Sequence, residues 1–264
     1  MTVKSALAIV MFAIFSTTPA GAKDTSGWGH HWPDGYLEKS SLPDSLSLLP
    51  PSPTWGTPRQ LMDEALNAEA LELEGTARFH LATKDADLNF PNAADNFSCA
   101  LGIEISVEKT PVLYDLMRKT MTDAGHSTKT AKEKYQRKRP FQVNGKTTCT
   151  PDDETFLSHN GSYPSGHATI GWTWALILAQ ISPDRSDAVL KRGMSFGNSR
   201  VICNVHWQSD VVEGRVLGAA VVAKLHGVAE FRSDLETAKT EVAAGQSPST
   251  DCAGEAETLK SWLH

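Results

Sequence analysis

Three short segments contain most of the side chains of this chain that could do chemistry. They are residues 132–140 (KEKYQRKRP), 164–167 (PSGH) and 199–210 (SRVICNVHWQSD). Together they supply a lysine, arginines, two histidines, a Ser-Gly pair and an aspartate. Cations and backbone N–H groups can hold an oxyanion while one imidazole attacks and a second protonates the leaving group. These residue types therefore indicate a site that handles phosphate.

The PSGH segment has the properties of a helix start that faces an anion. Pro164 favours an extended conformation at the residue before it, and Ser165 is then placed to cap a helix. Gly166 lets a ligand approach the backbone closely, and a helix N-terminus presents free N–H groups to phosphate. His167 lies in the first turn. An ordinary helix cap with a surface histidine explains the same four residues.

His206 and Asp210 are four residues apart, which places them on one face if the segment is helical. Asp210 can then accept a hydrogen bond from one imidazole nitrogen and leave the other as a nucleophile. Such a pair alone is a common surface contact. The pair becomes more indicative of a phosphate site because Ser199 and Arg200 lie just upstream and add a further fixed cation.

Lys132 and Arg139 bracket six residues and precede Pro140. Arginine can bind two phosphate oxygens at once, and lysine offers a point charge. The surrounding run also contains Lys129, Lys134, Arg137 and Lys138. A solvated helix face is the other interpretation of this run.

The order of these segments is what carries a resemblance. Lys-x6-Arg-Pro, Pro-Ser-Gly-His and Ser-Arg-x5-His-x3-Asp resemble the phosphatidic acid phosphatase type 2 and vanadium haloperoxidase superfamily, with every position filled. SLPDSLSLLPPSP, KEKYQRKRPF, NGSYPSGH and SRVICNVHWQSDV further resemble the class A bacterial non-specific acid phosphatases, from about residue 36 to 232. The resemblance implies an all-α, single-domain helical bundle. It also implies broad phosphomonoester hydrolysis that needs no metal or other cofactor.

The resemblance assigns a role to each matching position. His206 would be the nucleophile that becomes a phosphohistidine, Asp210 would orient it, and His167 would protonate the leaving group. The residues expected to bind the phosphate oxygens are Lys132, Arg139, Ser165, Gly166 and Arg200. Operation at acidic pH is expected if His167 begins protonated and His206 begins neutral.

Small phosphomonoesters are the expected substrates, phosphate or vanadate the expected inhibitors, and a homo-oligomer the expected assembly. A vanadate-dependent haloperoxidase is one alternative, because the same residues can hold vanadate. A non-catalytic periplasmic phosphate-binding protein is another, although it gives no reason for two histidines and an aspartate. The preferred substrate, pyrophosphate-bond cleavage and phosphate transfer to alcohols stay open.

Residues 1–22 are expected to be a signal peptide. Lys4 precedes an apolar run at 6–15, and Ala20-Gly21-Ala22 is a small-x-small cleavage signal. A retained membrane anchor is the alternative, but the run is shorter than the roughly 20 residues that span a bilayer. Cleavage leaves 242 residues and changes the formal charge from -6 to -7. An acidic exported chain favours the periplasm and argues against nucleic acid or membrane partners.

The mature chain divides into a proline-rich arm at 23–58, a helical catalytic domain at 59–235 and a polar tail at 236–264. Periodicity and capping residues predict eight to ten helices. The clearest predicted helices cover residues 59–81, 110–124, 165–181 and 211–228, with another starting at 182.

Cys99, Cys149, Cys203 and Cys252 show no spacing typical of a zinc site. Export favours disulfides, and three pairings are open. We favour Cys149–Cys203, because both flank the predicted site, with Cys99–Cys252 holding the tail.

Overall fold

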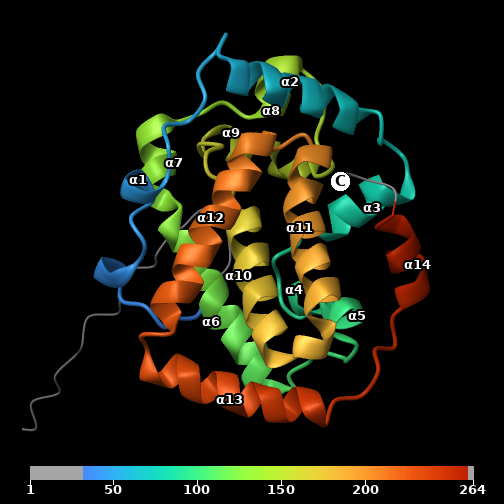
Figure 1. Ribbon diagram of the computed structural model, residues 1–264. Coiled ribbons are helices and arrows are strands. Elements are labelled where there is room, and N and C mark those ends of the chain that lie inside the picture. The colour runs from blue at the N-terminus through green and yellow to red at the C-terminus, as the bar shows by residue number, and fades with distance from the viewer. Residues whose placement is uncertain (1–31, 261–264) are drawn as a thin grey trace, which may run out of the picture. The chain divides into compact units, whose positions relative to one another are not determined.

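The computed structural model describes residues 32–260, which lie within one compact unit (Figure 1). This part of the chain contains helices and no strands. In chain order they are η1 (Lys39–Ser41), α1 (Ser45–Leu48), α2 (Pro58–Leu71), α3 (Ala77–Lys84), α4 (Asn92–Asp95), α5 (Ser98–Leu101), α6 (Pro111–Ser127), α7 (Lys129–Tyr135), α8 (Pro140–Asn144), η2 (Pro151–Asp153), α9 (Glu154–Ser158), α10 (Gly166–Ile181), η3 (Pro183–Arg185), α11 (Ser186–Ile202), α12 (Gln208–Leu225), α13 (Ala229–Ala243) and α14 (Cys252–Thr258). The predicted all-α, single-domain fold is confirmed. The predicted signal peptide lies outside the described residues.

Helix α10 forms the centre of the bundle. It is apolar over most of its length and packs against α6, α11, α12 and α13 (Figure 1). Trp174 is fully buried between the rings of Phe97 and Phe196. Burial of one such large apolar side chain stabilises the fold by roughly 1.5–3 kcal/mol. The prediction of a buried central helix at 165–181 is confirmed to within one residue.

Two glycines bring α12 unusually close to α10. A Cβ atom at Gly214 would lie 2.7 Å from the Ser165 carbonyl oxygen, and one at Gly218 would lie 2.7 Å from the Thr169 carbonyl oxygen. Only residues without a side chain fit at both positions. This close packing places the start of α10 beside the start of α12, where two of the predicted site segments lie.

Several helix boundaries differ from those expected. The helix predicted at 59–81 is two helices, α2 and α3, because the chain turns at Gly75 (φ 76°) and Thr76 then caps α3 with a hydrogen bond from Phe79 N–H. Helix α6 passes the expected stop at Gly125 and ends at Ser127. The predicted tail boundary at 235/236 falls inside α13, which continues to Ala243 because Leu235 and Ala238 are buried.

Residues 32–260 contain more helices than the eight to ten predicted. This part of the chain has 14 α-helices, of which five (α1, α4, α5, α8 and α9) contain only four or five residues. Such short helices are too brief to produce a recognisable periodicity. One of them, α4, lies between the predicted helices at 59–81 and 110–124.

Both favoured disulfides are present. Cys149 is bonded to Cys203 and Cys99 to Cys252. The second bond joins α14 to α5, because Cys252 lies in α14 and Cys99 lies in α5. A disulfide that closes a loop of this length typically stabilises a fold by about 2–4 kcal/mol.

None of the helices in residues 32–260 combines the length and the apolar character that a membrane crossing requires.

Candidate active site

The eight predicted site residues come from six places between α7 and α12. Lys132 lies in α7, Arg139 precedes α8, Arg200 lies in the last turn of α11, and His206 lies in the connection to α12. The others are Ser165, Gly166 and His167 at the start of α10, and Asp210 in the first turn of α12. Backbone hydrogen bonds join these parts: Ser165 N–H donates to the Asp210 carbonyl, and His206 N–H donates to the Arg200 carbonyl.

His206 is held at both ring nitrogens. Its Nδ1 lies 3.3 Å from Asp210 Oδ2, and its Nε2 lies 3.0 Å from Arg139 Nη1. A guanidinium can only donate hydrogen bonds, so Nε2 must be the acceptor and carries a lone pair. The proton of the neutral ring is therefore on Nδ1 and points to Asp210. This geometry leaves the ring lone pair on Nε2.

The expected pairing of His206 with Asp210 is present, but the helical geometry assumed for it is not. His206 precedes α12, and Trp207 is the N-cap residue of that helix. The carboxylate of Asp210 accepts the N–H of Trp207 at 2.9 Å and the hydroxyl of Ser162 at 2.5 Å. Asp210 thus caps its own helix while it holds the imidazole.

Arg137 supports Asp210 from behind, which the sequence did not reveal. Its guanidinium bonds Asp210 Oδ1 at 2.5 Å and Asp63 Oδ2 at 2.7 Å, and all three side chains are buried. Burial alone would raise the pKa of Asp210, but Arg137, His206 and Ser162 hold that pKa well below its usual range. Asp210 therefore stays ionised. Arg137 belongs to the basic run, but its partner Asp63 is 74 residues away in sequence.

Two of the predicted cations are anchored by backbone carbonyls. Lys132 Nζ donates to the Gly161 carbonyl at 2.6 Å, and Arg139 donates to the carbonyls of Leu157, Asn160 and Val205. Burial lowers the pKa of Arg139 to about 9. Burial and the nearby Arg139 charge lower the pKa of Lys132 well below its usual value. Both side chains are thus held in place, and their surroundings would stabilise a bound anion.

Arg200 is the most informative of the cations. It is 2% exposed, yet its Nε and Nη1 atoms have no hydrogen-bond partner among residues 32–260. Burial lowers the pKa of its guanidinium to about 10. Buried charged donors are normally paired, because an unpaired one costs several kcal/mol of desolvation. An anion bound beside Arg200 would supply the missing acceptors.

The start of α10 has the predicted form. Ser165 is the N-cap residue, and its hydroxyl oxygen accepts Ala168 N–H at 3.2 Å. A Cβ atom added at Gly166 would meet nothing within 4 Å, so open space adjoins the backbone there. His167 is 1% exposed, which excludes the interpretation of a surface histidine. Its Nε2 lies 3.0 Å from the Ala86 carbonyl, and its ring stacks on Phe196.

The surroundings of both site histidines favour the neutral form of the ring. Burial is the main cause that lowers each pKa well below 6.5, followed by Arg200 for His167 and by Arg139 for His206. A neutral His206 agrees with the expectation. The expected protonated form of His167 is disfavoured, because the cations around the ring oppose a further positive charge.

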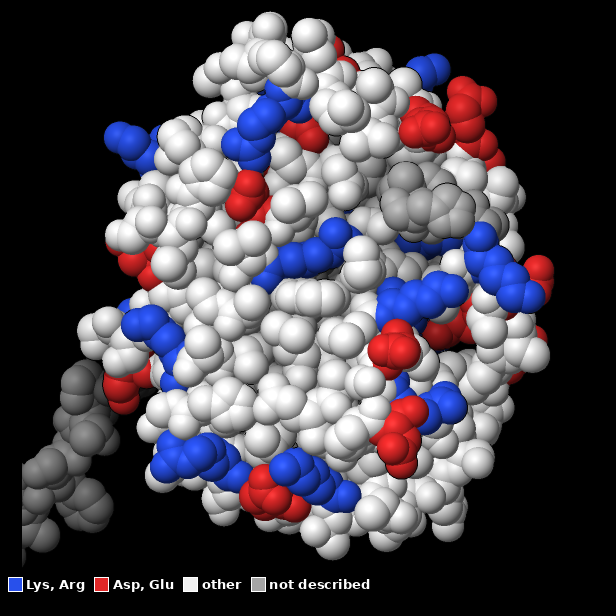
Figure 2. Space-filling view, in the orientation of Figure 1, with Lys and Arg blue, Asp and Glu red and all other residues white. Residues whose placement is uncertain are grey.

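Both interpretations of the basic run hold in part. Lys129, Lys134 and Lys138 are exposed, whereas Arg137 and Arg139 are buried and Lys132 is half-buried. Some side chains of the run therefore face solvent, and the others lie at the site. Elsewhere, charges of both signs are interspersed on the face that Figure 2 shows.

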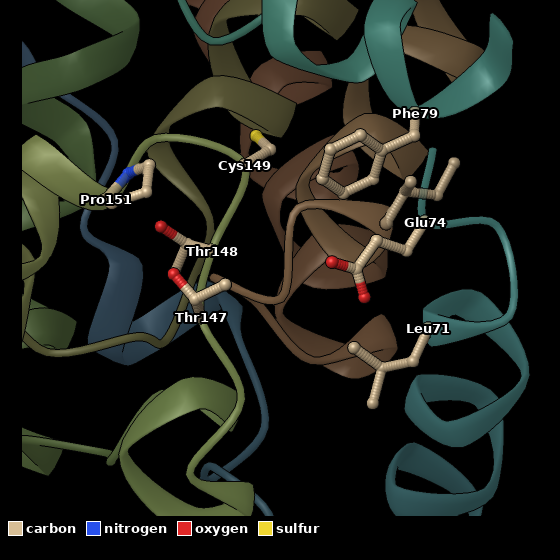
Figure 3. A pocket seen from close by; sticks show the side chains of 8 residues that line it. Leu71, Glu74, Phe79, Thr147, Thr148, Cys149 and Pro151 are labelled. Atoms are coloured by element: carbon tan, nitrogen blue, oxygen red, sulfur yellow. The ribbon is translucent and has the colours of Figure 1, made fainter. Parts of the chain in front are cut away.

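A pocket of about 260 Å³ lies beside the Cys149–Cys203 disulfide (Figure 3). Its lining is mostly apolar, from Leu71, Phe79, Pro151 and Ile202, with Glu74 as the one charged residue among the described residues that form it. It contains none of the eight predicted site residues and no cation. It is therefore distinct from the site described above.

In the part of the chain between Trp32 and Lys260, no three or more His, Cys, Asp or Glu residues are grouped so that they could hold a metal ion. Action without a metal stays a prediction.

Comparison with known proteins agrees with this arrangement. Residues 119–233 match the family model of the PAP2 superfamily, and this range includes all eight predicted site residues. The chain is 44% identical to a non-specific acid phosphatase of Providencia stuartii over 238 residues, which covers 89% of this chain and 94% of the relative. The chain belongs to the non-specific acid phosphatases of the PAP2 superfamily.

Two further relatives support the same assignment. An acid phosphatase of Zymomonas mobilis is 40% identical over 75% of each chain. A non-specific acid phosphatase of Salmonella typhimurium is 38% identical over 75% of this chain and 80% of the relative. The protein is an acid phosphatase.

Proposed function

We propose that this phosphatase hydrolyses small phosphomonoesters with broad specificity through a phosphohistidine at His206. The observation that carries the proposal is the pair of contacts on His206. Asp210 faces Nδ1 and a guanidinium faces Nε2, so the lone pair of Nε2 points to where phosphoryl oxygens would be held.

In the first step, Nε2 attacks phosphorus and the bond from phosphorus to the ester oxygen breaks. His167 gives a proton to the departing alkoxide, and Asp210 stabilises the imidazolium of His206. Lys132, Arg139 and Arg200 would bind the phosphoryl oxygens together with Ser165 and the Gly166 N–H group. Their positive charges would compensate the negative charge on these oxygens in the transition state.

In the second step, water attacks phosphorus and the P–N bond to His206 breaks. His167, now neutral, accepts the proton of the water, and inorganic phosphate leaves. An alcohol that replaces water at this step would give phosphotransferase activity. Export to the periplasm, a homo-oligomer, and inhibition by phosphate or vanadate belong to the same proposal and rest on the sequence.

The proposal is tested with a panel of alkyl, aryl, sugar and nucleotide phosphates at acidic and neutral pH, with EDTA and vanadate as additions. Hydrolysis of most of the panel, insensitivity to EDTA and inhibition by vanadate are expected. A rapid quench in alkali, where phosphohistidine survives, should trap phosphate on His206. Loss of activity in EDTA would contradict the metal-free mechanism. Halide oxidation by the vanadate-loaded protein without phosphatase activity would favour a haloperoxidase.

The state of His167 leads to a prediction about pH. The positive groups that face it are Arg200, Arg139 and His206 when charged, and its Nε2 contacts the Ala86 carbonyl. A bound phosphate anion compensates those charges and stabilises the imidazolium. We expect NMR titration of His167 to give a pKa below 6.5 in the free protein and a higher pKa with inorganic phosphate.

The sign of this shift explains how His167 can act as an acid after all. The substrate brings the negative charge that allows protonation, so the acid is formed in the complex. The unfolded chain binds protons on both histidines below about pH 6.5, while the folded free protein resists them. Stability of the free protein should therefore fall as the pH decreases below that value. A His167 pKa that stays constant or falls on phosphate binding would contradict this account.

A further inference from the structure

His167 rests on two supports that lie outside the three motif segments. One is the Ala86 carbonyl oxygen, 3.0 Å from Nε2. The other is the ring of Phe196, whose centroid lies 6.2 Å from that of the imidazole at an interplanar angle of 26°. A carbonyl only accepts hydrogen bonds, so the neutral ring keeps its proton on Nε2. Nδ1 is then the atom that exchanges a proton with the substrate.

One side chain, Arg192 of α11, lies over the Phe196 ring and pairs with Asp85, the residue next to Ala86. Its guanidinium forms a two-pronged ion pair with Asp85, the residue directly before Ala86, with Nη1 3.1 Å from Oδ2. The same guanidinium lies 5.7 Å from the centroid of the Phe196 ring. Arg192 and Asp85 are both 0% exposed. The ion pair therefore lies directly beside both groups that contact His167.

The pair is part of a larger buried cluster. The Ser199 hydroxyl donates to Asp85 Oδ2 at 2.6 Å and accepts from Arg78 Nη2 at 3.0 Å. Ser199 directly precedes Arg200, so the cluster also fixes the end of α11 that carries this site cation. This contact gives the serine of the Ser-Arg motif a structural role.

Helix α14 completes the charge balance of the cluster. Arg78 and Arg192 are two cations, and Asp85 supplies one anion. The second anion is Glu255 of α14, whose Oε1 lies 3.3 Å from Arg192 Nε. Helix α14 packs beside α3 (Figure 1), and the Cys99–Cys252 disulfide bonds it to α5.

We propose that the buried Arg192–Asp85 pair positions His167 for proton transfer. Both are positioning residues, because neither touches the reacting atoms. The proposal rests on the proposed function, in which His167 protonates the leaving group. Loss of the pair would let the Ala86 carbonyl and the Phe196 ring move, and His167 Nδ1 would no longer point at the ester oxygen.

The test compares leaving groups. An alkyl phosphate needs a proton on its leaving oxygen, whereas 4-nitrophenolate leaves readily without one. For Asp85→Asn, we expect kcat/KM for an alkyl phosphate to fall at least roughly tenfold, within the roughly 10²–10⁴-fold that a positioned general acid supplies. The kcat/KM for 4-nitrophenyl phosphate should change little. Asp115→Asn is the matched control, because Asp115 pairs with Lys119 on the surface, and it should leave both values unchanged.

A double-mutant cycle places the effect at His167. In a His167→Ala background, Asp85→Asn should not change the ratio of the two kcat/KM values further. An equal loss for both substrates, or the same change of the ratio in that background, would show a merely structural role and overturn the proposal.

A second measurement covers the case in which Asp85→Asn does not fold. Side-chain ¹⁵N NMR of the wild-type protein should show His167 with its proton on Nε2 and protected from exchange. A proton on Nδ1 instead would overturn the proposal without any variant. This NMR measurement does not depend on turnover. Failure to trap phosphate on His206 would reject the proposed function, and the NMR spectrum would still report the orientation of His167.

Discussion

Replacing His206 with alanine is expected to lower kcat for 4-nitrophenyl phosphate by roughly 10⁴-fold or more, the scale on which removal of a nucleophile acts in other hydrolases. The substitution removes Nε2, the only protein atom that forms a bond to phosphorus in the proposed mechanism. Lys132, Arg139 and Arg200 remain, so inorganic phosphate should still bind. Steady-state kinetics and isothermal titration with phosphate measure the two effects separately.

Two comparisons make this result specific. His80→Ala removes an exposed histidine of α3 and should leave kcat unchanged. Imidazole added to His206→Ala should restore part of the activity, because the lost ring leaves a space bordered by Arg139, Ser162 and Asp210. Turnover within tenfold of the wild type would reject His206 as the nucleophile and return attention to another residue.

Replacing Arg200 with alanine should reduce kcat/KM by about 10²–10³-fold, the effect of losing one donor aimed at developing charge. The cost to stability should be small, because Nε and Nη1 of Arg200 have no hydrogen-bond partner within residues 32–260. Removing an unpaired buried cation also removes its desolvation penalty. Kinetics and urea unfolding in phosphate-free buffer measure both quantities.

Arg139 provides the contrast. Its substitution by alanine should impair kcat/KM to a similar extent, but it also removes the donor that three backbone carbonyls share. Each buried acceptor left without a partner costs about 1–3 kcal/mol, so Arg139→Ala should be clearly less stable than Arg200→Ala.

The variant Arg200→Lys tests the chemistry of the contact. It keeps a charge but not the planar fork, and should recover only part of the lost activity. Equal loss of stability in Arg139→Ala and Arg200→Ala would contradict the assignment of Arg200 as a cation held ready for the substrate.

The candidate site residues could be selected from the sequence because they are concentrated in short motifs. Pro164 and Ser165 mark the start of α10 by rules that act over a few residues, and the helix begins at Gly166 as expected. The disulfide pairing did not follow from spacing: three pairings were open, and the favoured one rested on Cys149 and Cys203 flanking the motifs. Local rules were sufficient only where the interacting residues lie close together in sequence.

The contacts that support the motifs could not be predicted in this way. Arg137 meets Asp63, and Arg192 meets Asp85, across separations of 74 and 107 residues. No local pattern marks either aspartate as buried, and an isolated Asp on a short helix normally indicates a surface position. These pairs follow from how α2 and α3 pack on the bundle.

The protonation state of His167 could not be predicted from the sequence either. The motif indicates an acid, but the pKa depends on the cations that the fold gathers around a buried ring. Charge seen in sequence gives no measure of burial. In the mechanism proposed above, the substrate supplies the opposing charge.

The covalent attachment of α14 has a consequence for proteolysis. The segment between α13 and α14 contains no helix and is largely exposed, so it is a natural place for a protease to cut. A cut there would not release α14, because Cys252 remains bonded to Cys99. Glu255 would stay beside Arg192 in the nicked protein, and only a reductant would set the C-terminal fragment free.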